Sequence, residues 1–331
     1  MLKKKIRLLI VEDSSFFVKR LVSIIGTAED IEIIGIADNG VDALDKIEEL
    51  NPDVITMDIT MPLLDGIEVV RRVIKRKNIP IIMLSAHTME GASDTFDALQ
   101  AGAIDFISKD VKELTHDVVI KKIRAVAKLE AVKYTTTDDK SKKLKGKNYK
   151  LVVIGASTGG PMVVESILSS LPENFAIPIL VVMHMPREFV PHYVERISAK
   201  IKLPIEVLEN DKVLGPSIYI SPGGMNVEFR KNKCQVVKAD DECIYQPNID
   251  LAMSSAAKNF KENLLGIILT GMGGDGLNGA KDIRDNGGNV WLQSIESCAV
   301  SGMVMSIKNS GEFDRIYSDA YIGTRLIEIG D

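Results

Sequence analysis

The feature that most constrains this chain is a regular alternation of short β-branched apolar runs with segments of helical periodicity, repeated along most of its 331 residues. Strands that are apolar on both faces are typical of a parallel sheet covered by helices on both sides. Five such pairs in residues 1–133 predict a doubly wound (βα)5 α/β domain. Its predicted strands are Ile6–Val11, Ile31–Ile36, Val54–Met57, Ile81–Leu84 and Ile104–Ile107.

A second alternation occupies residues 151–331 and predicts another α/β domain, whose mainly parallel sheet carries some antiparallel decoration. The predicted parallel strands are Leu151–Ile154, Ile179–Met183, Ile205–Leu208, Ile218–Ile220, Leu264–Leu269 and Val290–Leu292, and a hairpin joins Val227–Phe229 to Cys234–Val237. Residues 134–150, YTTTDDKSKKLKGKNYK, contain almost nothing to bury. We expect a solvated linker there, with an ordered surface loop as the alternative.

Composition excludes several classes of protein. No segment approaches the roughly 18 uninterrupted apolar residues of a membrane-spanning helix, and the lysines at the start run into an acidic segment without a signal-peptide cleavage region. We therefore expect a cytoplasmic protein without membrane insertion. A net charge of -5 disfavours a general nucleic-acid binder, which needs a clustered basic surface. Cys234, Cys243 and Cys298 lack CxxC spacing, which disfavours a disulfide framework or a zinc site.

Polar and charged residues follow four of the five predicted strands of the first domain, on the side where doubly wound sheets bind ligands. They are Glu12 and Asp13 after the first strand, Asp58 after the third, Ser85 after the fourth and Lys109 after the fifth. Three carboxylates at one edge repel each other unless a cation lies among them, and oxygen ligands suit Mg2+. An aspartate beside Mg2+ and a lysine can attack phosphorus, because the two cations neutralise the phosphoryl oxygens. The alternative is that these charges merely decorate loop ends.

With the segment MDITMPLLDG, in which a turn at Met61-Pro62 precedes a helix start near Asp65, this set closely resembles a two-component receiver domain. The resemblance implies that Asp58 is the phospho-acceptor, that Glu12 and Asp13 bind the metal, that Ser85 and Phe106 are the switch hydroxyl and aromatic, and that Lys109 senses the phosphate. Receivers usually place proline after this lysine, whereas Asp110 stands here. We expect a trans peptide at this bond, because a cis bond without proline costs about 3 kcal/mol.

In the second domain, the first predicted strand leads through GASTGGP into a helix. A G-x-S-x-G turn between a strand and a helix exposes a serine hydroxyl, here that of Ser157, at a helix N-terminus where backbone N–H groups can hold an oxyanion. Two alternatives stay open. The turn can bind a phosphate or dinucleotide, although it lacks the G-x-G-x-x-G order and the P-loop ending, or it can serve as a turn only.

A catalytic serine needs a base and an orienting acid. His184 ends a predicted strand on the same edge of the sheet as Ser157, whereas His192 lies inside a predicted helix. Asp275 is the only acid in the glycine-rich loop TGMGGDG, which follows a third strand. We therefore expect a Ser157, His184 and Asp275 triad, in a chain order unlike that of the α/β-hydrolases.

The segments GASTGGP, VVMHMP, YISPGGMN, NIDLAMSSAA, LTGMGGDG and SIESCAVSGM closely resemble, in order, the catalytic domain of the chemotaxis protein-glutamate methylesterases. In these response regulators a receiver precedes the esterase. The resemblance implies that Ser157 is the nucleophile, that His184 is first general base and then general acid, and that Asp275 orients it. It implies that the Met272 backbone N–H stabilises the oxyanion and that Thr158 shapes the pocket.

The same resemblance implies a reaction and partners. It implies hydrolysis of glutamyl methyl esters on transmembrane chemoreceptors to glutamate and methanol, together with glutamine deamidation. A chemotaxis histidine kinase would supply the phosphoryl group, Mg2+ would serve receiver phosphorylation, and ester hydrolysis would need no cofactor. The receiver would inhibit the esterase until it is phosphorylated.

Two other classes of output remain for the second domain. A nucleic-acid-binding or partner-binding module is disfavoured by its length and by glycine loops around acids in place of a basic recognition helix. A degenerate hydrolase that serves as a scaffold is disfavoured by the complete set of triad residue types.

Overall fold

A computed structural model describes residues 4–77, 79–86, 88–110, 114–127, 148–238 and 246–330 of the chain. The chain divides into two compact units, Met1–Ala131 and Val132–Asp331, which we describe separately. Most of the expected linker, residues 134–147, and Cys243 lie outside the described residues.

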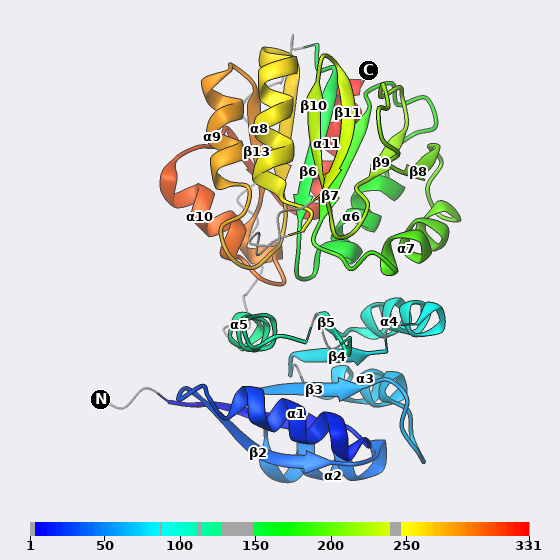
Figure 1. Ribbon diagram of the computed structural model, residues 1–331, viewed down its shortest axis with the longest axis vertical. Helices are drawn as coiled ribbons and strands as arrows, with labels where there is room; N and C mark the ends of the chain where they lie inside the picture. The colour runs from blue at the N-terminus through cyan, green and yellow to red at the C-terminus, as the bar shows by residue number, and fades with distance from the viewer. Residues whose placement is uncertain are drawn as a thin grey trace. The chain divides into compact units, whose positions relative to one another are not determined.

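The first unit alternates five strands with five helices (Figure 1). In chain order they are β1 (Ile6–Val11), α1 (Ser15–Ile25), β2 (Ile31–Ala37), α2 (Gly40–Leu50), β3 (Val54–Asp58), α3 (Gly66–Ile74), β4 (Ile81–Ser85), α4 (Met89–Ala101), β5 (Asp105–Ser108) and α5 (His116–Val126). Helix starts follow the expected chemistry: the Asp65 side chain accepts from the backbone N–H of Glu68 at the start of α3. This agrees with the predicted turn and helix start after β3.

The sheet of the first unit is parallel throughout, in the order β2-β1-β3-β4-β5. The inner strands are apolar on both faces: all five residues of β3 and of β4 are buried. Because the chain winds outward in opposite directions from β1 and β3, the carboxyl ends of these two strands form a switch point, where such folds bind ligands. The predicted (βα)5 fold is confirmed.

The second unit contains nine strands and six α-helices among the described residues, with short 3₁₀ turns after α8 and β13. Its elements are β6 (Leu151–Ala156), α6 (Gly160–Ser169), β7 (Ile179–Met183), α7 (Phe189–Ser198), β8 (Ile205–Val207), β9 (Ile218–Ile220), β10 (Met225–Arg230), β11 (Lys233–Lys238), α8 (Ile249–Phe260), β12 (Leu264–Ile268), α9 (Leu277–Asp285), β13 (Asn289–Gln293), α10 (Gly302–Ser310), β14 (Arg315–Tyr317) and α11 (Asp319–Gly330).

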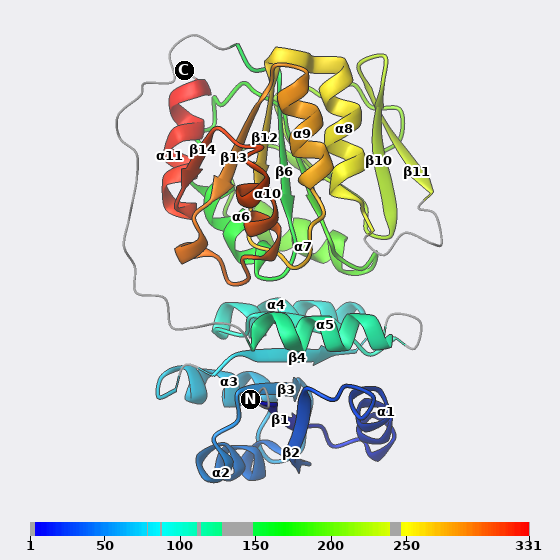
Figure 2. The same ribbon diagram turned by 90° about the vertical axis from the view of Figure 1, so that its left-hand side faces the viewer.

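Seven of these strands form one parallel sheet in the order β14-β13-β12-β6-β7-β9-β8, and β10 and β11 pair as an antiparallel hairpin. Figures 1 and 2 show α8 and α9 on one face of the sheet and α6 and α11 on the other. β6 is buried along its whole length. Winding reverses between β6 and β12, so a second switch point lies where the sequence placed its serine. The expected mainly parallel α/β fold with antiparallel decoration is confirmed.

Two features of the second unit differ from expectation. The sequence analysis did not identify β14 and α11, since β14 has only three residues and α11 contains two glycines. Tyr149, assigned to the linker, is 5% exposed, and its hydroxyl donates to Asn289 Oδ1 at 2.7 Å. The segment that packs against the second unit therefore begins before Leu151.

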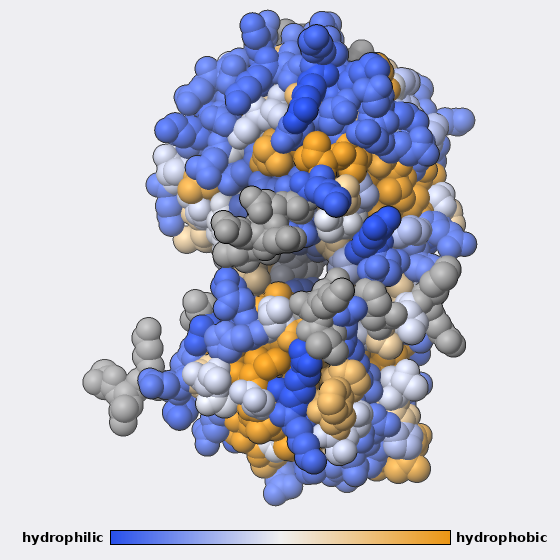
Figure 3. Space-filling model, viewed as in Figure 1, coloured by the Kyte–Doolittle hydropathy of each residue, from blue (hydrophilic) through white to orange (hydrophobic). Residues whose placement is uncertain are grey.

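The surface fits the composition. No described helix is long and apolar enough to cross a membrane. Figure 3 shows hydrophilic residues over much of the visible face, with apolar residues gathered in separate groups. Cys234 is buried and Cys298 half-buried, and both are free thiols.

Candidate functional site

Acidic residues of the first unit meet at the switch point between β1 and β3. Glu12 follows β1 and Asp58 ends β3, and both are almost fully buried, whereas Asp13 is exposed. One carboxylate oxygen from each of the three lies within 4.8 Å of the others. Lys109 follows β5 and reaches this cluster, with its Nζ 2.7 Å from Glu12 Oε2 and 2.8 Å from Asp58 Oδ1.

The electrostatics of this cluster favour a bound cation. Burial raises the pKa of the Glu12 carboxyl above its ordinary value, and the charge of Asp58 raises it further. Burial also raises the pKa of Asp58, against the opposing hydrogen bond from Lys109. Glu12 Oε2 has its ion pair with Lys109 but no hydrogen bond of good geometry. Three crowded carboxylates with spare oxygen lone pairs fit a small hard cation such as Mg2+.

The expected switch residues lie on the neighbouring strands. Ser85, at the end of β4, is buried; its Oγ lies 2.5 Å from Thr95 Oγ1 of α4 and donates to the Gly91 carbonyl at 3.2 Å. Phe106 of β5 is 6% exposed, and its carbonyl accepts from Lys122 Nζ at 2.6 Å. Thr95 and Lys122 therefore contact Ser85 and Phe106 directly, and the sequence analysis did not identify either of them.

The peptide bond between Lys109 and Asp110 has the expected trans configuration. The cis peptide in the described part of the chain is Gln246-Pro247, so the Lys109-Asp110 bond is trans. The Lys109 ammonium nevertheless reaches both buried acids. Proline after this lysine is therefore not required to bring its side chain into the cluster.

In the second unit, Ser157 lies on a tight turn between β6 and α6. Its carbonyl accepts from Gly160 N at 2.7 Å, and its own N–H donates to the Thr270 carbonyl at 3.0 Å. Gly159 has a φ of +76°, and a Cβ there would lie 2.5 Å from the Ala299 Cβ. Only glycine fits this conformation and this close approach, so the predicted elbow depends on it.

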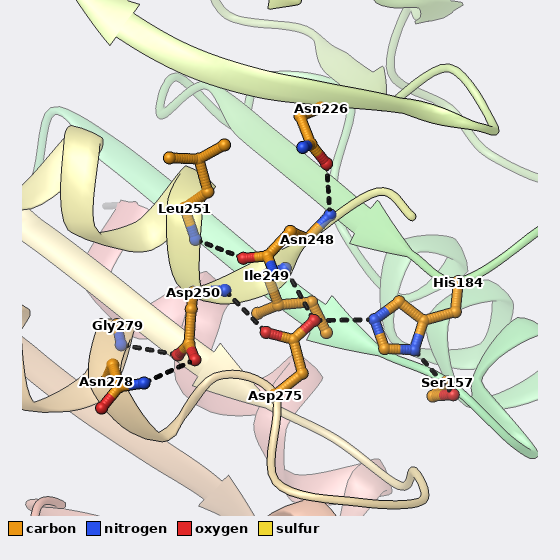
Figure 4. Close-up of polar contacts among 10 residues, drawn as sticks. All are labelled: Ser157, His184, Asn226, Asn248, Ile249, Asp250, Leu251, Asp275, Asn278 and Gly279. Atoms are coloured by element: carbon orange, nitrogen blue, oxygen red, sulfur yellow. Dashed lines mark hydrogen bonds and ion pairs between the residues drawn. The ribbon is translucent and has the colours of Figure 1, made fainter. Parts of the chain in front are cut away.

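Figure 4 shows that Ser157, His184 and Asp275 form a continuous hydrogen-bonded chain. His184 Nδ1 lies 3.0 Å from Ser157 Oγ, and His184 Nε2 lies 2.8 Å from Asp275 Oδ2. A carboxylate can only accept, so Nε2 carries the proton and the lone pair of Nδ1 faces the serine hydroxyl. The Asp275 side chain is 1% exposed and that of His184 13% exposed. This arrangement can remove a proton from Ser157 and stabilise the resulting imidazolium.

Asp275 is fixed by more than the histidine. Its Oδ2 also accepts from Ile249 N at 2.8 Å, and its Oδ1 accepts from Asp250 N at 2.9 Å, both at the start of α8 (Figure 4). Three donors therefore orient the carboxylate. The positive end of the α8 dipole stabilises its charge.

The glycine-rich loop after β12 lies directly against the serine. A Cβ on Gly271 would be 2.9 Å from Ser157 Cβ, so the residue before Met272 packs closely against Ser157. Thr158 is 2% exposed, and its carbonyl accepts from Thr270 Oγ1 at 2.9 Å. Thr270 thus ties the serine turn to this loop, a role for which the sequence offered no signal beyond its place in LTGMGGDG.

His192, the other histidine of the second unit, lies elsewhere. It is on α7, with Nδ1 3.9 Å from Glu195 Oε2 one turn away on the same helix. The base that the structure places beside Ser157 is His184.

Comparison with known proteins identifies the family of each unit. Residues 152–326 match the family model described as CheB methylesterase, and residues 8–124 match the response regulator receiver domain. The chain belongs to the CheB methylesterase family.

Relatives cover nearly the whole chain. A protein-glutamate methylesterase/protein-glutamine glutaminase of Saccharophagus degradans is 36% identical, over 97% of this chain and 98% of its own. A protein of the same name from Vibrio cholerae is 34% identical, over 92% and 94%. The crystal structure of the Thermotoga maritima CheB methylesterase catalytic domain is 34% identical and superposes with a TM-score of 0.52, over 54% of this chain and 98% of that domain.

Proposed function

We propose that this chain is a phosphorylation-regulated protein-glutamate methylesterase that hydrolyses glutamyl methyl esters on chemoreceptors and also deamidates receptor glutamines. The observation that carries the proposal is the hydrogen-bonded chain of Ser157, His184 and Asp275 at the switch point of a CheB-family sheet. The names of its full-length relatives support the substrate class.

The geometry supports acyl transfer. His184 Nδ1 accepts the proton of Ser157 Oγ as this oxygen attacks the ester carbonyl carbon, and the carbonyl electron pair moves onto its oxygen. The Met272 backbone N–H, in the loop whose Gly271 packs against Ser157, is the proposed donor to that oxyanion, and the buried Thr158 shapes the pocket wall. Collapse breaks the bond to methoxide, which takes the proton from Nδ1 and leaves as methanol.

Water completes the reaction without a cofactor. His184 removes a proton from water, which attacks the acyl-enzyme carbonyl, and collapse returns that proton to Ser157 Oγ with release of glutamate. A glutamine amide enters the same cycle, with ammonia in place of methanol. Asp275 takes up no proton in this cycle; its role is to orient His184 and to stabilise the imidazolium.

The first unit supplies the regulation. Asp58 is the proposed phospho-acceptor, with a chemotaxis histidine kinase as phosphodonor, and Glu12, Asp13 and Asp58 would hold Mg2+. The cation supplies charge neutralisation for phosphoryl transfer. Lys109 contacts the added phosphoryl oxygens. Ser85 and Phe106 are the proposed switch residues, which respond to phosphorylation of Asp58.

The test uses methylated chemoreceptor membranes and the full chain. Ser157→Ala and His184→Ala should each lower kcat/KM for methanol release by several orders of magnitude while circular dichroism stays that of the wild type. Glutamine deamidation, followed as ammonia release, should fall in parallel. A folded Ser157→Ala variant with near wild-type turnover would refute the assignment of the nucleophile.

A further inference from the structure

Two carboxylates in the second unit link the starts of α8 and α9, because each accepts hydrogen bonds from the start of the other helix (Figure 4). Asp275 precedes α9 and accepts from the first two N–H groups of α8, those of Ile249 and Asp250. Asp250 lies in the first turn of α8, and its Oδ1 accepts from Gly279 N at 2.7 Å while its Oδ2 accepts from Asn278 Nδ2 at 3.1 Å. Each helix start is thus satisfied by the carboxylate of the other.

These reciprocal hydrogen bonds depend on a close approach of α8 and α9. A Cβ on Gly279 would lie 2.6 Å from Met253 Cβ and 3.3 Å from Asp250 Cα, so glycine permits the contact. The two carboxylates are close enough that burial and the charge of Asp275 raise the pKa of Asp250 above its ordinary value. The hydrogen bonds that each carboxylate accepts offset the repulsion between the two like charges.

We propose that Asp250 is a positioning residue, which holds Asp275 in the orientation that His184 requires. This inference rests on the proposed esterase function. Asp275 Oδ2 is shared by His184 Nε2 and Ile249 N, so any rotation of the α8 start relative to the Asp275 loop moves the oxygen away from the imidazole. The Asp250 side chain prevents that rotation, because it joins the α8 start to the α9 start that follows Asp275 by two residues.

The prediction for substitutions follows from this placement. Asp250→Ala removes both acceptors and should lower kcat by about 10- to 100-fold with KM changed less than about twofold, since small displacements of a catalytic group cost this much. Asp250→Asn keeps an acceptor for Gly279 N and should recover most of the lost kcat. Because Asp250 acts through Asp275, Asp250→Ala should cause no further loss when Asp275→Ala is already present.

Asp314→Asn is the matched control. Asp314 also accepts from a backbone N–H, that of Val290 at 2.7 Å, but at the start of β13, at the opposite end of the strands from Ser157. This variant should lower the free energy of unfolding without changing kcat. If Asp250→Ala does not fold, Asn278→Ala takes its place, removes one donor to Asp250, and should lower kcat severalfold.

The experiment measures methanol release from methylated receptor by the full chain, beside urea unfolding. A wild-type kcat in Asp250→Ala, or an equal loss with and without Asp275→Ala, would overturn the positioning role. Equal turnover by the wild-type protein and Ser157→Ala would refute the proposed function itself, and the role of Asp250 with it. Turnover that depends on Ser157 but not on Asp250 would refute the role of Asp250 alone.

Discussion

Replacement of the triad acid by its amide, Asp275→Asn, gives the most direct test of the site. The side chain keeps its shape but has one acceptor oxygen where the native residue has two. In the native site Oδ2 serves His184 and Ile249, and Oδ1 serves Asp250. Either orientation of the amide therefore turns its NH2 group against a backbone N–H at the start of α8, which costs about 1 to 3 kcal/mol of stability.

The two orientations of the amide set the lower and upper limits of the expected loss of activity. With the amide oxygen toward His184, the tautomer is kept and only the charge is lost; a hydrogen bond to a charged group is worth about 1.5 to 3 kcal/mol, or roughly 10- to 150-fold in kcat. With the NH2 group toward His184, Nε2 becomes an acceptor and Nδ1 carries the proton, so Ser157 has no base. Amide replacement of a triad acid that imposes the wrong tautomer has cost about 10⁴-fold in kcat in a serine protease.

We therefore expect Asp275→Asn to lower kcat by about 10- to 10⁴-fold and to lower the free energy of unfolding by about 1 to 3 kcal/mol. Methanol release from methylated receptor gives the first quantity, and urea unfolding followed by circular dichroism gives the second. Asp275→Ala, which cannot impose the wrong tautomer, should lose less activity than the amide variant if the second orientation predominates. A folded Asp275→Asn variant within tenfold of the wild type would refute the role of the carboxylate.

Three further predictions concern other parts of the chain. Asp58→Asn should abolish Mg2+-dependent labelling from a phosphodonor and its stimulation of the esterase, while basal hydrolysis persists; labelling at the wild-type rate would place the acceptor elsewhere. The fragment 148–331, which keeps the buried Tyr149, should hydrolyse methylated receptor without a phosphodonor at least as fast as the phosphorylated whole chain, and a fragment slower than the unphosphorylated chain would refute inhibition by the receiver. Burial raises the pKa of the Cys234 thiol from 9.0 to about 12, so the free energy of unfolding should fall as pH rises from 9 toward 12, where only the unfolded thiol ionises; Cys234→Ala should make that fall less steep in urea unfolding at a series of pH values.

The sequence predicted the strands and the edges where both sites lie, because buried parallel strands have a strong pattern and function gathers at their carboxyl ends. Asp275 was identifiable because it is the only acid in its loop, and His184 because it follows a strand directly. The short β14 and the glycine-containing α11 were not identified, since three residues and a weak periodicity do not separate a strand and helix from a loop.

Residues that support the sites through tertiary contacts could not be predicted. Thr270 binds the Thr158 carbonyl, 112 residues away in the chain, and Asp250 binds Gly279, 29 residues away. Threonine and aspartate near helix starts and loops usually have local roles such as capping. Only the packing of α8 against α9, and of the β12 loop against the serine turn, distinguishes these two from ordinary capping residues.

Strand order also explains which imidazole nitrogen meets which partner. Ala156 and Met183 are register partners on the adjacent strands β6 and β7, so the residues that follow them, Ser157 and His184, begin side by side. The nitrogen nearer the backbone, Nδ1, therefore reaches Ser157 at 3.0 Å. β12 lies on the other side of β6, and Asp275 stands seven residues past its end, so the distal nitrogen, Nε2, has to reach the carboxylate. This is the reverse of the pairing in the chymotrypsin triad, where Nε2 faces the serine, and it follows from the strand order in this sheet.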